Sequence, residues 1–267
     1  MGRRPVVGKR VLITGALGGF GRASTDLLRS RGANVAGLDI EADPQRDVIA
    51  CDITDTGRTD EAVAEAVELL GGLDVLVNNA GIGTAQAVAA GAEDADRAVI
   101  ETNVLGTWHV TTAALPWLAE SRGHVVNVAS LLAVLSIPYS AAYSASKRAV
   151  VALSDVLRAE HGETIAVTTV YPGYSNTAIH GPAAERIGLS LEGKVPEEGA
   201  DQVARWIAYA IERRPRDVAT SRQGNVVLRV ARTAPGLVAW LGRKRAEQLS
   251  ELVPRPQIPP VRERAHR

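Results

Sequence analysis

The segment TGALGGFG, residues 14–21, constrains the fold of this chain more than any other stretch. It follows the apolar run RVLITG (10–15) and leads into GRASTDLLRSRG (21–32), a helical pattern that ends at a glycine, a common helix stop. Because glycines lack side chains, such a turn lets the backbone approach a pyrophosphate, and the helix N-terminus adds free N–H groups and a partial positive charge. The segment predicts a dinucleotide-binding β–α unit; the alternative is an ordinary glycine-rich turn.

The alternation of strand and helix continues along the chain. Near-continuous apolar runs predict strands, and helical spacing predicts helices; the strands are 34–39, 48–53, 74–81, 124–130 and 165–173, and the helices are 60–71, 93–119 and 140–161. Such runs are typical of parallel strands buried on both faces. We expect an α/β fold, a Rossmann-like doubly wound parallel β-sheet with helices on both faces, as a single domain at 1–221. Residues 222–267 form an expected C-terminal helical extension with a disordered tail.

Composition argues against several functions. Lys+Arg and Asp+Glu both number 30 and aromatics make up 4%, which disfavours nucleic acid as the main partner. The lone Cys51 cannot form an intramolecular disulfide and fits a reducing compartment. Lys9 and Arg10 interrupt the first apolar run, so we expect no signal peptide, and no stretch approaches the ~20 apolar residues of a membrane-spanning helix. We expect a cytoplasmic protein without a metal, because no histidine pair has metal-ligand spacing.

Asp39 ends the second predicted strand and bears on the choice of cofactor. A carboxylate there can accept hydrogen bonds from both ribose hydroxyls of adenosine and would repel a 2′-phosphate. Neither Ile40 nor Gly18 is basic, as NADP binding would normally require. NAD is therefore the expected cofactor, unless Asp39 is merely a solvated strand end. Asp52 follows the third strand at the same sheet edge and could meet the adenine ring.

Tyr143 and Lys147 are candidates for catalysis. They lie four residues apart, on one face of the predicted helix 140–161. An ammonium within ~4–6 Å favours phenolate and lowers the tyrosine pKa toward the working pH, where proton transfer is efficient. Ser130 ends the preceding strand, so all three groups can converge at the carboxyl edge of the sheet. The spacing alone could arise by chance, so the other motifs have to support it.

Motifs in a family-specific order provide that support: TGALGGFG (14–21), CDI (51–53), NNAG (78–81), Asn103 in ETNVLG, Ser130 after VVNVA, YSASK (143–147) and PG (172–173) with Thr177 behind it. On these motifs, residues 8–221 resemble a short-chain dehydrogenase/reductase of the single-domain type. The resemblance implies that Tyr143 is the general acid/base and that Lys147 holds the nicotinamide ribose and lowers the tyrosine pKa. It further implies that Ser130 hydrogen-bonds the substrate oxygen and that Asn103 continues a proton relay through water.

The resemblance also implies which residues contact the cofactor. Asn79, Ala80 and Gly81 would line the adenosine side, and the 172–177 segment would border the nicotinamide. Ser175 stands where Val is common, at a position expected to use its backbone. The whole expected set is Gly15, Gly18, Gly19, Phe20, Gly21, Asp39, Ile40, Asp52, Ile53, Asn79, Ala80, Gly81, Tyr143, Lys147, Pro172, Gly173, Ser175 and Thr177.

The substrate is expected to be a hydrophobic alcohol or ketone. LLAVLSIPY (131–139) predicts an apolar wall beside Ser130, although these residues could instead be core. AIHGPAAERIGLSLEGKVP (178–196) lacks a clean period and contains Gly and Pro, which predicts a lid over the substrate, with His180 more typical of a solvated loop than of a substrate contact. The expected substrate contacts are Leu131, Leu132, Tyr139 and Tyr174.

The C-terminal extension leaves two interpretations open. Its apolar residues recur at helical spacing, and Pro235–Gly236 should bend or split the helix; they are Val226, Val227, Val230, Ala234, Leu237, Val238 and Leu241. The basic residues around them allow peripheral membrane contact, or packing over the substrate site or a neighbouring subunit. The resemblance implies a homodimer or homotetramer through the helices at 93–119 and 140–161.

The expected function is NAD-dependent interconversion of a hydrophobic secondary alcohol and its ketone. One alternative is NADPH-type carbonyl or oxoacyl reduction in lipid or polyketide metabolism, against which Asp39 speaks. Another is a cofactor-sensing protein that has lost catalysis, against which the presence of both Tyr143 and Lys147 speaks.

Overall fold

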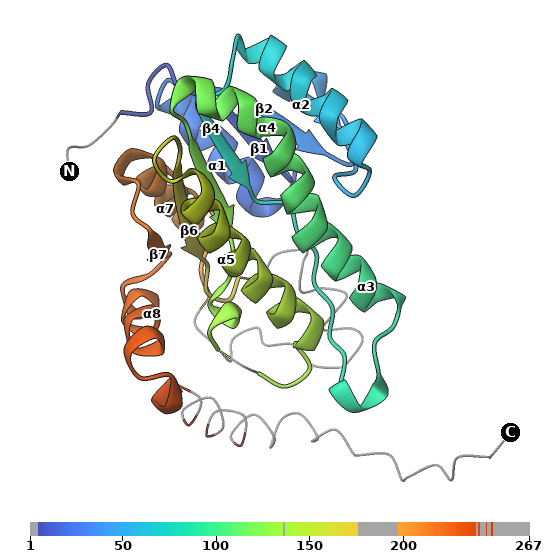
Figure 1. Ribbon diagram of the computed structural model, residues 1–267, viewed down its shortest axis with the longest axis vertical. Helices are drawn as coiled ribbons and strands as arrows, with labels where there is room; N and C mark the ends of the chain where they lie inside the picture. The colour runs from blue at the N-terminus through green and yellow to red at the C-terminus, as the bar shows by residue number, and fades with distance from the viewer. Residues whose placement is uncertain are drawn as a thin grey trace, which may run out of the picture.

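The computed structural model describes residues 5–135, 137–175 and 197–238, together with residues 240, 244 and 247. In this part of the chain the strands form a 7-stranded sheet in the order β3-β2-β1-β4-β5-β6-β7 (Figure 1). Every pairing is parallel. The strands are β1 (Arg10–Thr14), β2 (Asn34–Asp39), β3 (Val48–Ala50), β4 (Val75–Asn78), β5 (His124–Val128), β6 (Ala166–Tyr171) and β7 (Asp217–Ala219). The order reverses between β1 and β4, where doubly wound sheets bind ligands, and the expected fold class is confirmed.

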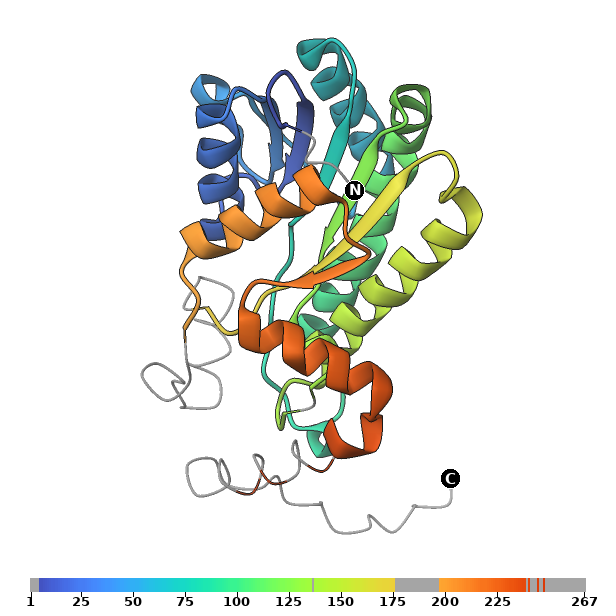
Figure 2. The same ribbon diagram turned by 90° about the vertical axis from the view of Figure 1, so that its left-hand side faces the viewer.

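Helices cover both faces of this sheet (Figure 2). They are α1 (Gly19–Ser30), α2 (Thr56–Leu70), α3 (Asp94–Ile100), α4 (Thr107–Ser121), α5 (Ala141–His161), α7 (Ala200–Arg213) and α8 (Arg222–Thr233). Shorter turns are η1 (Pro44–Arg46), η2 (Val88–Ala90), η4 (Leu131–Ala133) and the π-helical turn η3 (Glu101–Gly106). One core cluster joins the sheet to α1 and α7, and another joins it to α2, α4 and α5.

The apolar run of β1 serves both of these cores. Leu12 packs in the cluster that contains α2, α4 and α5, whereas Val11 and Ile13 pack in the cluster that contains α1 and α7. Successive side chains of a strand point to opposite faces, so a strand covered on both sides has no polar face. This double burial explains the near-continuous apolar runs in the sequence.

Several predicted boundaries are wrong. The strands predicted at 74–81 and 165–173 end at Asn78 and Tyr171, and the helix predicted at 93–119 is interrupted by η3. Sequence reasoning also missed β7 and α7. Strand β7 has only 3 residues, too few to give a periodic signal.

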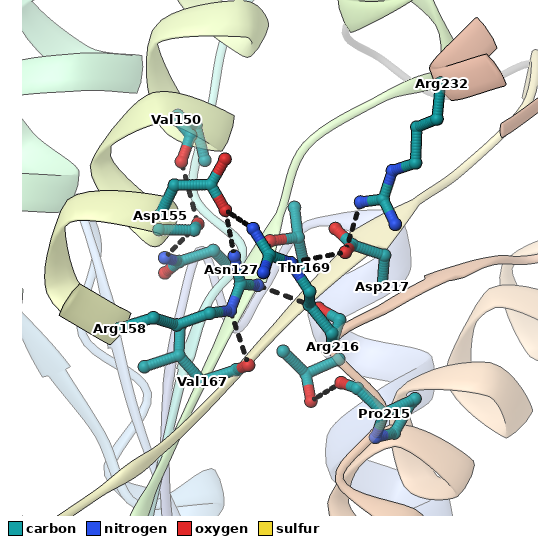
Figure 3. Close-up of polar contacts among 12 residues, drawn as sticks. Asn127, Val150, Asp155, Arg158, Val167, Thr169, Pro215, Arg216, Asp217 and Arg232 are labelled. Atoms are coloured by element: carbon teal, nitrogen blue, oxygen red, sulfur yellow. Dashed lines mark hydrogen bonds and ion pairs between the residues drawn. The ribbon is translucent and has the colours of Figure 1, made fainter. Parts of the chain in front are cut away.

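An arginine on α5 ties that helix to the far edge of the sheet (Figure 3). Arg158 donates to the Thr169 hydroxyl of β6 at 2.7 Å and to the Arg216 carbonyl, just before β7, at 2.8 Å. It also forms an ion pair with Asp155 at 2.6 Å. These contacts fix the edge strands relative to α5, the helix that carries the catalytic candidates.

Helix α8 packs onto this edge of the sheet. Asp217 of β7 forms an ion pair with Arg232 of α8 (Figure 3) and accepts a hydrogen bond from the Tyr171 hydroxyl at 3.0 Å. Leu228 of α8 is buried in a third core cluster with Ala219, and part of the η4 turn packs against that cluster. Helix α8 thus packs against β7 and the η4 turn, and its packing over a substrate site or a neighbouring subunit stays a prediction.

The buried face of the extension differs from the prediction. Gly224 and Leu228 are the buried residues of α8, whereas Val226 is 58% exposed, because the face is set by contact with β7 and η4. Leu237 is exposed as well, and Leu241 lies outside the described residues. The helix does end before Pro235: α8 stops at Thr233, and helical residues resume at 235–238.

Candidate active site

The glycine turn between β1 and α1 has no room for side chains at two positions. A Cβ atom on Gly15, whose φ is +65°, would lie 2.9 Å from the Ala80 Cα, and a Cβ atom on Gly21 would lie 2.0 Å from the Gly15 carbonyl oxygen. Gly18 is the N-cap residue of α1 and provides no side-chain cap, and both Gly18 and Gly19 are exposed. The first N–H groups of α1 are thus not capped by a side chain, and the turn fits the pyrophosphate of a dinucleotide.

The residues after β4 fasten this turn. The Asn79 side chain donates to the carbonyls of Thr14 at 3.0 Å and Gly15 at 3.1 Å. The Thr14 hydroxyl accepts the backbone N–H groups of Asn79 and Ala80, each at 3.0 Å. Asn79 thus holds the turn in shape through its side-chain amide. Sequence reasoning did not single out Thr14, whose hydroxyl completes this connection.

The Asp39 carboxylate lies beside the same turn. Its Oδ2 accepts the Leu17 N–H at 2.8 Å, and its Oδ1 accepts the Ile40 N–H at 2.8 Å. Ile40 is 76% exposed. Each carboxylate oxygen can accept more than one hydrogen bond, so the oriented carboxylate keeps acceptor capacity for a ligand at the open end of β2.

Three of the expected cofactor contacts, Asp52, Ile53 and Phe20, already contact other residues of the protein through their side chains. The exposed Asp52 accepts the N–H and hydroxyl of Thr54 at 2.9 and 2.8 Å. Ile53 is buried against Gly106, where an added Cβ would lie 2.6 Å from its Cγ1. Phe20 packs against the core cluster of α1 and α7. Cofactor contacts at Phe20 and Ile53 would therefore use backbone atoms.

Ser130, Tyr143 and Lys147 meet at the carboxyl end of β5, as the sequence predicts. Ser130 begins η4, where its hydroxyl oxygen accepts the Leu132 N–H at 3.1 Å. Tyr143, in the first turn of α5, shares a side-chain hydrogen bond with Ser130. The Lys147 Nζ donates to the Val128 carbonyl at 3.0 Å and lies 5.8 Å from the centre of the Tyr143 ring.

Burial controls the proton affinity of this pair. Desolvation raises the pKa of Tyr143 to about 12, an effect that the hydrogen bond with Ser130 partly opposes. Desolvation also lowers the pKa of Lys147, which is 4% exposed, to about 8. Apolar surroundings disfavour the charged form of each group. In the protein alone burial acts against the expected lowering of the tyrosine pKa, and the effect of Lys147 together with a bound dinucleotide stays a prediction.

Asn103 is fully buried in the π-helical turn η3. Its Oδ1 accepts the Ile82 N–H at 2.9 Å, and its Nδ2 donates to the Ile82 carbonyl at 2.9 Å. A Cβ atom on Gly81 would lie 3.0 Å from the Asn103 Oδ1 and 3.2 Å from the Lys147 Nζ. Gly81 therefore lets η3, α5 and the segment after β4 come together, and π-helical turns are frequent at such functional sites.

Ser146 connects Asn103 to the backbone of Tyr143, and sequence reasoning missed it. The Asn103 Nδ2 donates to the Ser146 hydroxyl at 2.9 Å, and that hydroxyl donates to the Tyr143 carbonyl at 2.8 Å. The position of Ser146 within YSASK, directly before Lys147, is the signal that could have identified it.

The Pro172–Gly173 turn follows β6 beside Ser130. The Leu131 N–H donates to the Pro172 carbonyl at 2.8 Å, and the Gly173 N–H donates to Glu198 at 3.0 Å. Ser175 is buried, and Thr177 lies outside the described residues. Glu198 was also missed, because it precedes α7 without a motif that marks it.

The expected substrate residues lie on several segments. Leu131 and Leu132 are half-buried in η4, and Leu131 packs against the third core cluster, so it belongs in part to the core. Tyr139 has a positive φ of 64°, and its carbonyl accepts the Gln86 N–H at 2.9 Å. The Tyr174 carbonyl accepts the Glu198 N–H at 2.8 Å. The predicted lid at 178–196, with His180, lies outside the described residues.

Within the described residues, no group of three or more His, Cys, Asp or Glu side chains is arranged to hold a metal ion. None of the helices in the same part of the chain combines the length and apolar character needed to cross a bilayer.

Comparisons with known proteins agree with this geometry. A family model described as short chain dehydrogenase matches residues 9–187. The Mus musculus protein "Dehydrogenase/reductase SDR family member 7B" is 32% identical over 262 residues, covering 89% of this chain and 81% of that protein. A "3-ketodihydrosphingosine reductase" from Bacteroides thetaiotaomicron is 34% identical over 174 residues, covering 62% of this chain and 64% of that protein.

A solved structure has the same fold. A short chain dehydrogenase from Burkholderia cenocepacia, in complex with NADP, matches with a TM-score of 0.76 and 25% identity. The match covers 91% of this chain and 99% of that chain. The Burkholderia protein, which shares the fold of this chain, holds NADP in that structure.

Proposed function

This chain belongs to the short-chain dehydrogenase/reductase family of oxidoreductases, and we propose that it interconverts a hydrophobic secondary alcohol and its ketone with NAD. The observation that carries the proposal is the meeting of Ser130, Tyr143 and Lys147 at the carboxyl end of β5, with buried Asn103 behind them. An acid, a hydrogen-bond donor and a cation at one point suit chemistry at a carbonyl or alcohol oxygen.

In this proposal Tyr143 exchanges a proton with the substrate oxygen while Ser130 donates a hydrogen bond to that oxygen. The bound nicotinamide supplies the site for hydride transfer, and the protein supplies orientation and electrostatics. With its pKa raised to about 12, Tyr143 is protonated at neutral pH and is ready to act as an acid in ketone reduction. Alcohol oxidation requires the phenolate, which additional positive charge near the ring would favour.

Lys147 and Asn103 hold the reacting groups in place. The Lys147 Nζ donates to the Val128 carbonyl at 3.0 Å, and this side chain would hold a ribose hydroxyl of a bound dinucleotide. Asn103 fixes the turn after β4 through the Ile82 backbone and reaches Tyr143 through Ser146. We propose that these contacts keep the Tyr143 ring aligned.

Asp39 supports NAD as the cofactor. Two backbone N–H groups orient its carboxylate beside the glycine turn, where it would accept ribose hydroxyls and repel a 2′-phosphate. The apolar residues of η4 support a hydrophobic substrate, since Leu131 and Leu132 directly follow Ser130.

A second candidate is the reduction of a lipid-like ketone with NADPH. Two comparisons favour it: the Bacteroides relative is named a 3-ketodihydrosphingosine reductase, and the Burkholderia structure holds NADP. Both candidates use the same proton donor and the same apolar wall. The ratio of kcat/KM with NADH and NADPH for one ketone distinguishes them, and a preference for NADPH would favour the second candidate.

We also propose that the chain forms a homo-oligomer through α4 and α5. The support is that these helices and the adjoining η3 carry exposed apolar residues: Trp108 of α4 is 55% exposed, Val156 of α5 is 51% exposed and Leu105 of η3 is 36% exposed. Peripheral membrane contact by the extension is a separate proposal, supported by the exposed Val226, Leu237 and Trp240. Sedimentation and vesicle co-flotation test these two proposals separately.

Tyr143→Phe tests the central role. The variant should lose nearly all turnover of alcohols and ketones graded by size and polarity, followed by NADH fluorescence, while its affinity for NAD stays within a few-fold of the wild type. Tyr209→Phe, on the exposed side of α7, is the matched control and should keep full turnover. An active Tyr143→Phe enzyme would contradict the proposed mechanism.

A further inference from the structure

Glu198 is a buried carboxylate at the edge of the candidate site. The residue keeps 8% of its surface exposed, its Oε2 accepts the Gly173 N–H at 3.0 Å, and the Thr220 hydroxyl donates a short hydrogen bond to the same oxygen. A Cβ atom on Gly173 would lie 2.9 Å from the Glu198 Oε1. The carboxylate therefore lies directly against the backbone of Gly173. Within the described part of the chain it has no ion-pair partner.

Gly173 is close to the reacting groups. The Pro172 carbonyl accepts the N–H of Leu131, the residue after Ser130, at 2.8 Å. The reactive end of a dinucleotide has to reach Ser130 and Tyr143, because the proton and the hydride leave or arrive at neighbouring atoms of one substrate. The Pro172–Gly173 turn thus lies between Glu198 and the groups that would carry out the redox chemistry.

A buried carboxylate would change the balance of charge around a bound nicotinamide ring. Lys147 is a buried amine on the α5 side, and as an ammonium it repels any second cation placed beside it. The oxidised nicotinamide ring is a cation, whereas the reduced ring is neutral. Glu198 accepts two hydrogen bonds at one carboxylate oxygen, and a fixed charge in a poorly hydrated region acts strongly on a neighbouring charge.

We propose that Glu198 is an electrostatic positioning residue that acts through the Pro172–Gly173 turn and makes the site bind the oxidised cofactor in preference to the reduced one. The inference rests on the proposed function, since it requires a nicotinamide dinucleotide at Ser130 and Tyr143. It deepens that function by giving the site a bias toward one redox form of the cofactor.

Two variants remove the charge. Glu198→Gln keeps the size of the side chain and an acceptor oxygen, and Glu198→Met replaces the carboxylate with an apolar chain of similar length. The dissociation constants of NAD and NADH are measured separately, by calorimetry and by NADH fluorescence, without substrate. The ratio of the NAD to the NADH dissociation constant should rise on the order of tenfold in both variants.

Thr220→Val is the matched control. It removes the hydroxyl that donates to Glu198 but leaves the carboxylate charge, so the ratio should stay within about twofold of the wild type. A merely structural role for Glu198 would weaken both cofactor forms equally. An unchanged ratio in whichever charge-removing variant folds would overturn the inference, whereas a wild-type protein that binds neither form would instead overturn the proposed function.

Discussion

Replacing Lys147 with methionine should stabilise the protein alone while it abolishes turnover. Methionine has nearly the length of the lysine chain and carries no charge, so it fits the same buried space. Burial lowers the pKa of Lys147 from 10.5 to about 8, so the folded protein holds this ammonium at a cost of about 3 kcal/mol at neutral pH. The lost hydrogen bond to the Val128 carbonyl offsets about 1 kcal/mol of the gain. The net gain is about 2 kcal/mol, or roughly 5 °C in Tm.

The gain should depend on pH with a definite sign. Between pH 8 and 10.5 the unfolded lysine still binds a proton that the folded lysine has released, so the wild type becomes more stable relative to its unfolded state as the pH rises. Lys147→Met lacks this group, so its advantage of about 2 kcal/mol should be complete below pH 8 and fall as the pH rises. Near pH 10.5 the variant should be about 1 kcal/mol less stable than the wild type, because only the loss of the hydrogen bond to Val128 remains. Burial raises the pKa of Tyr143 to about 12, so this group stays protonated in the folded state over the range and its effect cancels in the comparison.

Thermal and urea unfolding of both proteins without cofactor, from pH 6.5 to 10.5, measures this difference. Lys9→Met is the control, because Lys9 is partly exposed and its ion pair with Asp74 at 3.9 Å is long, so the change should stay within about 0.5 kcal/mol. The reasoning would be refuted by a Lys147→Met protein that is no more stable than the wild type at pH 7, or by a gain that does not change with pH.

Three further predictions concern the cofactor turn and the sheet edge. Asp39→Ala should raise the kcat/KM ratio for NADP over NAD by tenfold or more, and an unchanged ratio would contradict its assigned role. Gly21→Ala should weaken dinucleotide binding by at least about tenfold, with circular dichroism as the check on folding, because its Cβ would lie 2.0 Å from the Gly15 carbonyl oxygen. Tyr171→Phe should lower the free energy of unfolding by about 1–2 kcal/mol, since it removes the hydrogen bond to the buried Asp217 carboxylate. Urea midpoints measure the loss, and a neutral change would show that the ion pairs with Arg232 and Arg216 satisfy Asp217 without the tyrosine.

Patterns within one segment predicted much of the site. The glycine turn, Asp39 at the end of β2 and Ser130 at the end of β5 were placed correctly, because a strand end and a glycine turn are local features. The parallel strands then bring these ends to one edge of the sheet. The i, i+4 spacing of Tyr143 and Lys147 likewise follows from helix geometry alone.

Contacts between residues far apart in the sequence could not be predicted from such patterns. Glu198 meets Gly173 across 25 positions of sequence, and Ser146 meets Asn103 across 43, and neither contact follows a local period. The buried face of α8 centres on Leu228 because β7 and η4 happen to cover that side.

The sequence by itself determined the fold class, the site of the dinucleotide turn and the identity of the groups at the end of β5. The reason is that strand alternation, glycine turns and helix spacing depend on residues a few positions apart. The tertiary structure decided the proton affinities of Tyr143 and Lys147 and the carboxylate behind Gly173. Desolvation and charge depend on everything packed around a group, and here burial raises the tyrosine pKa that a neighbouring lysine was expected to lower.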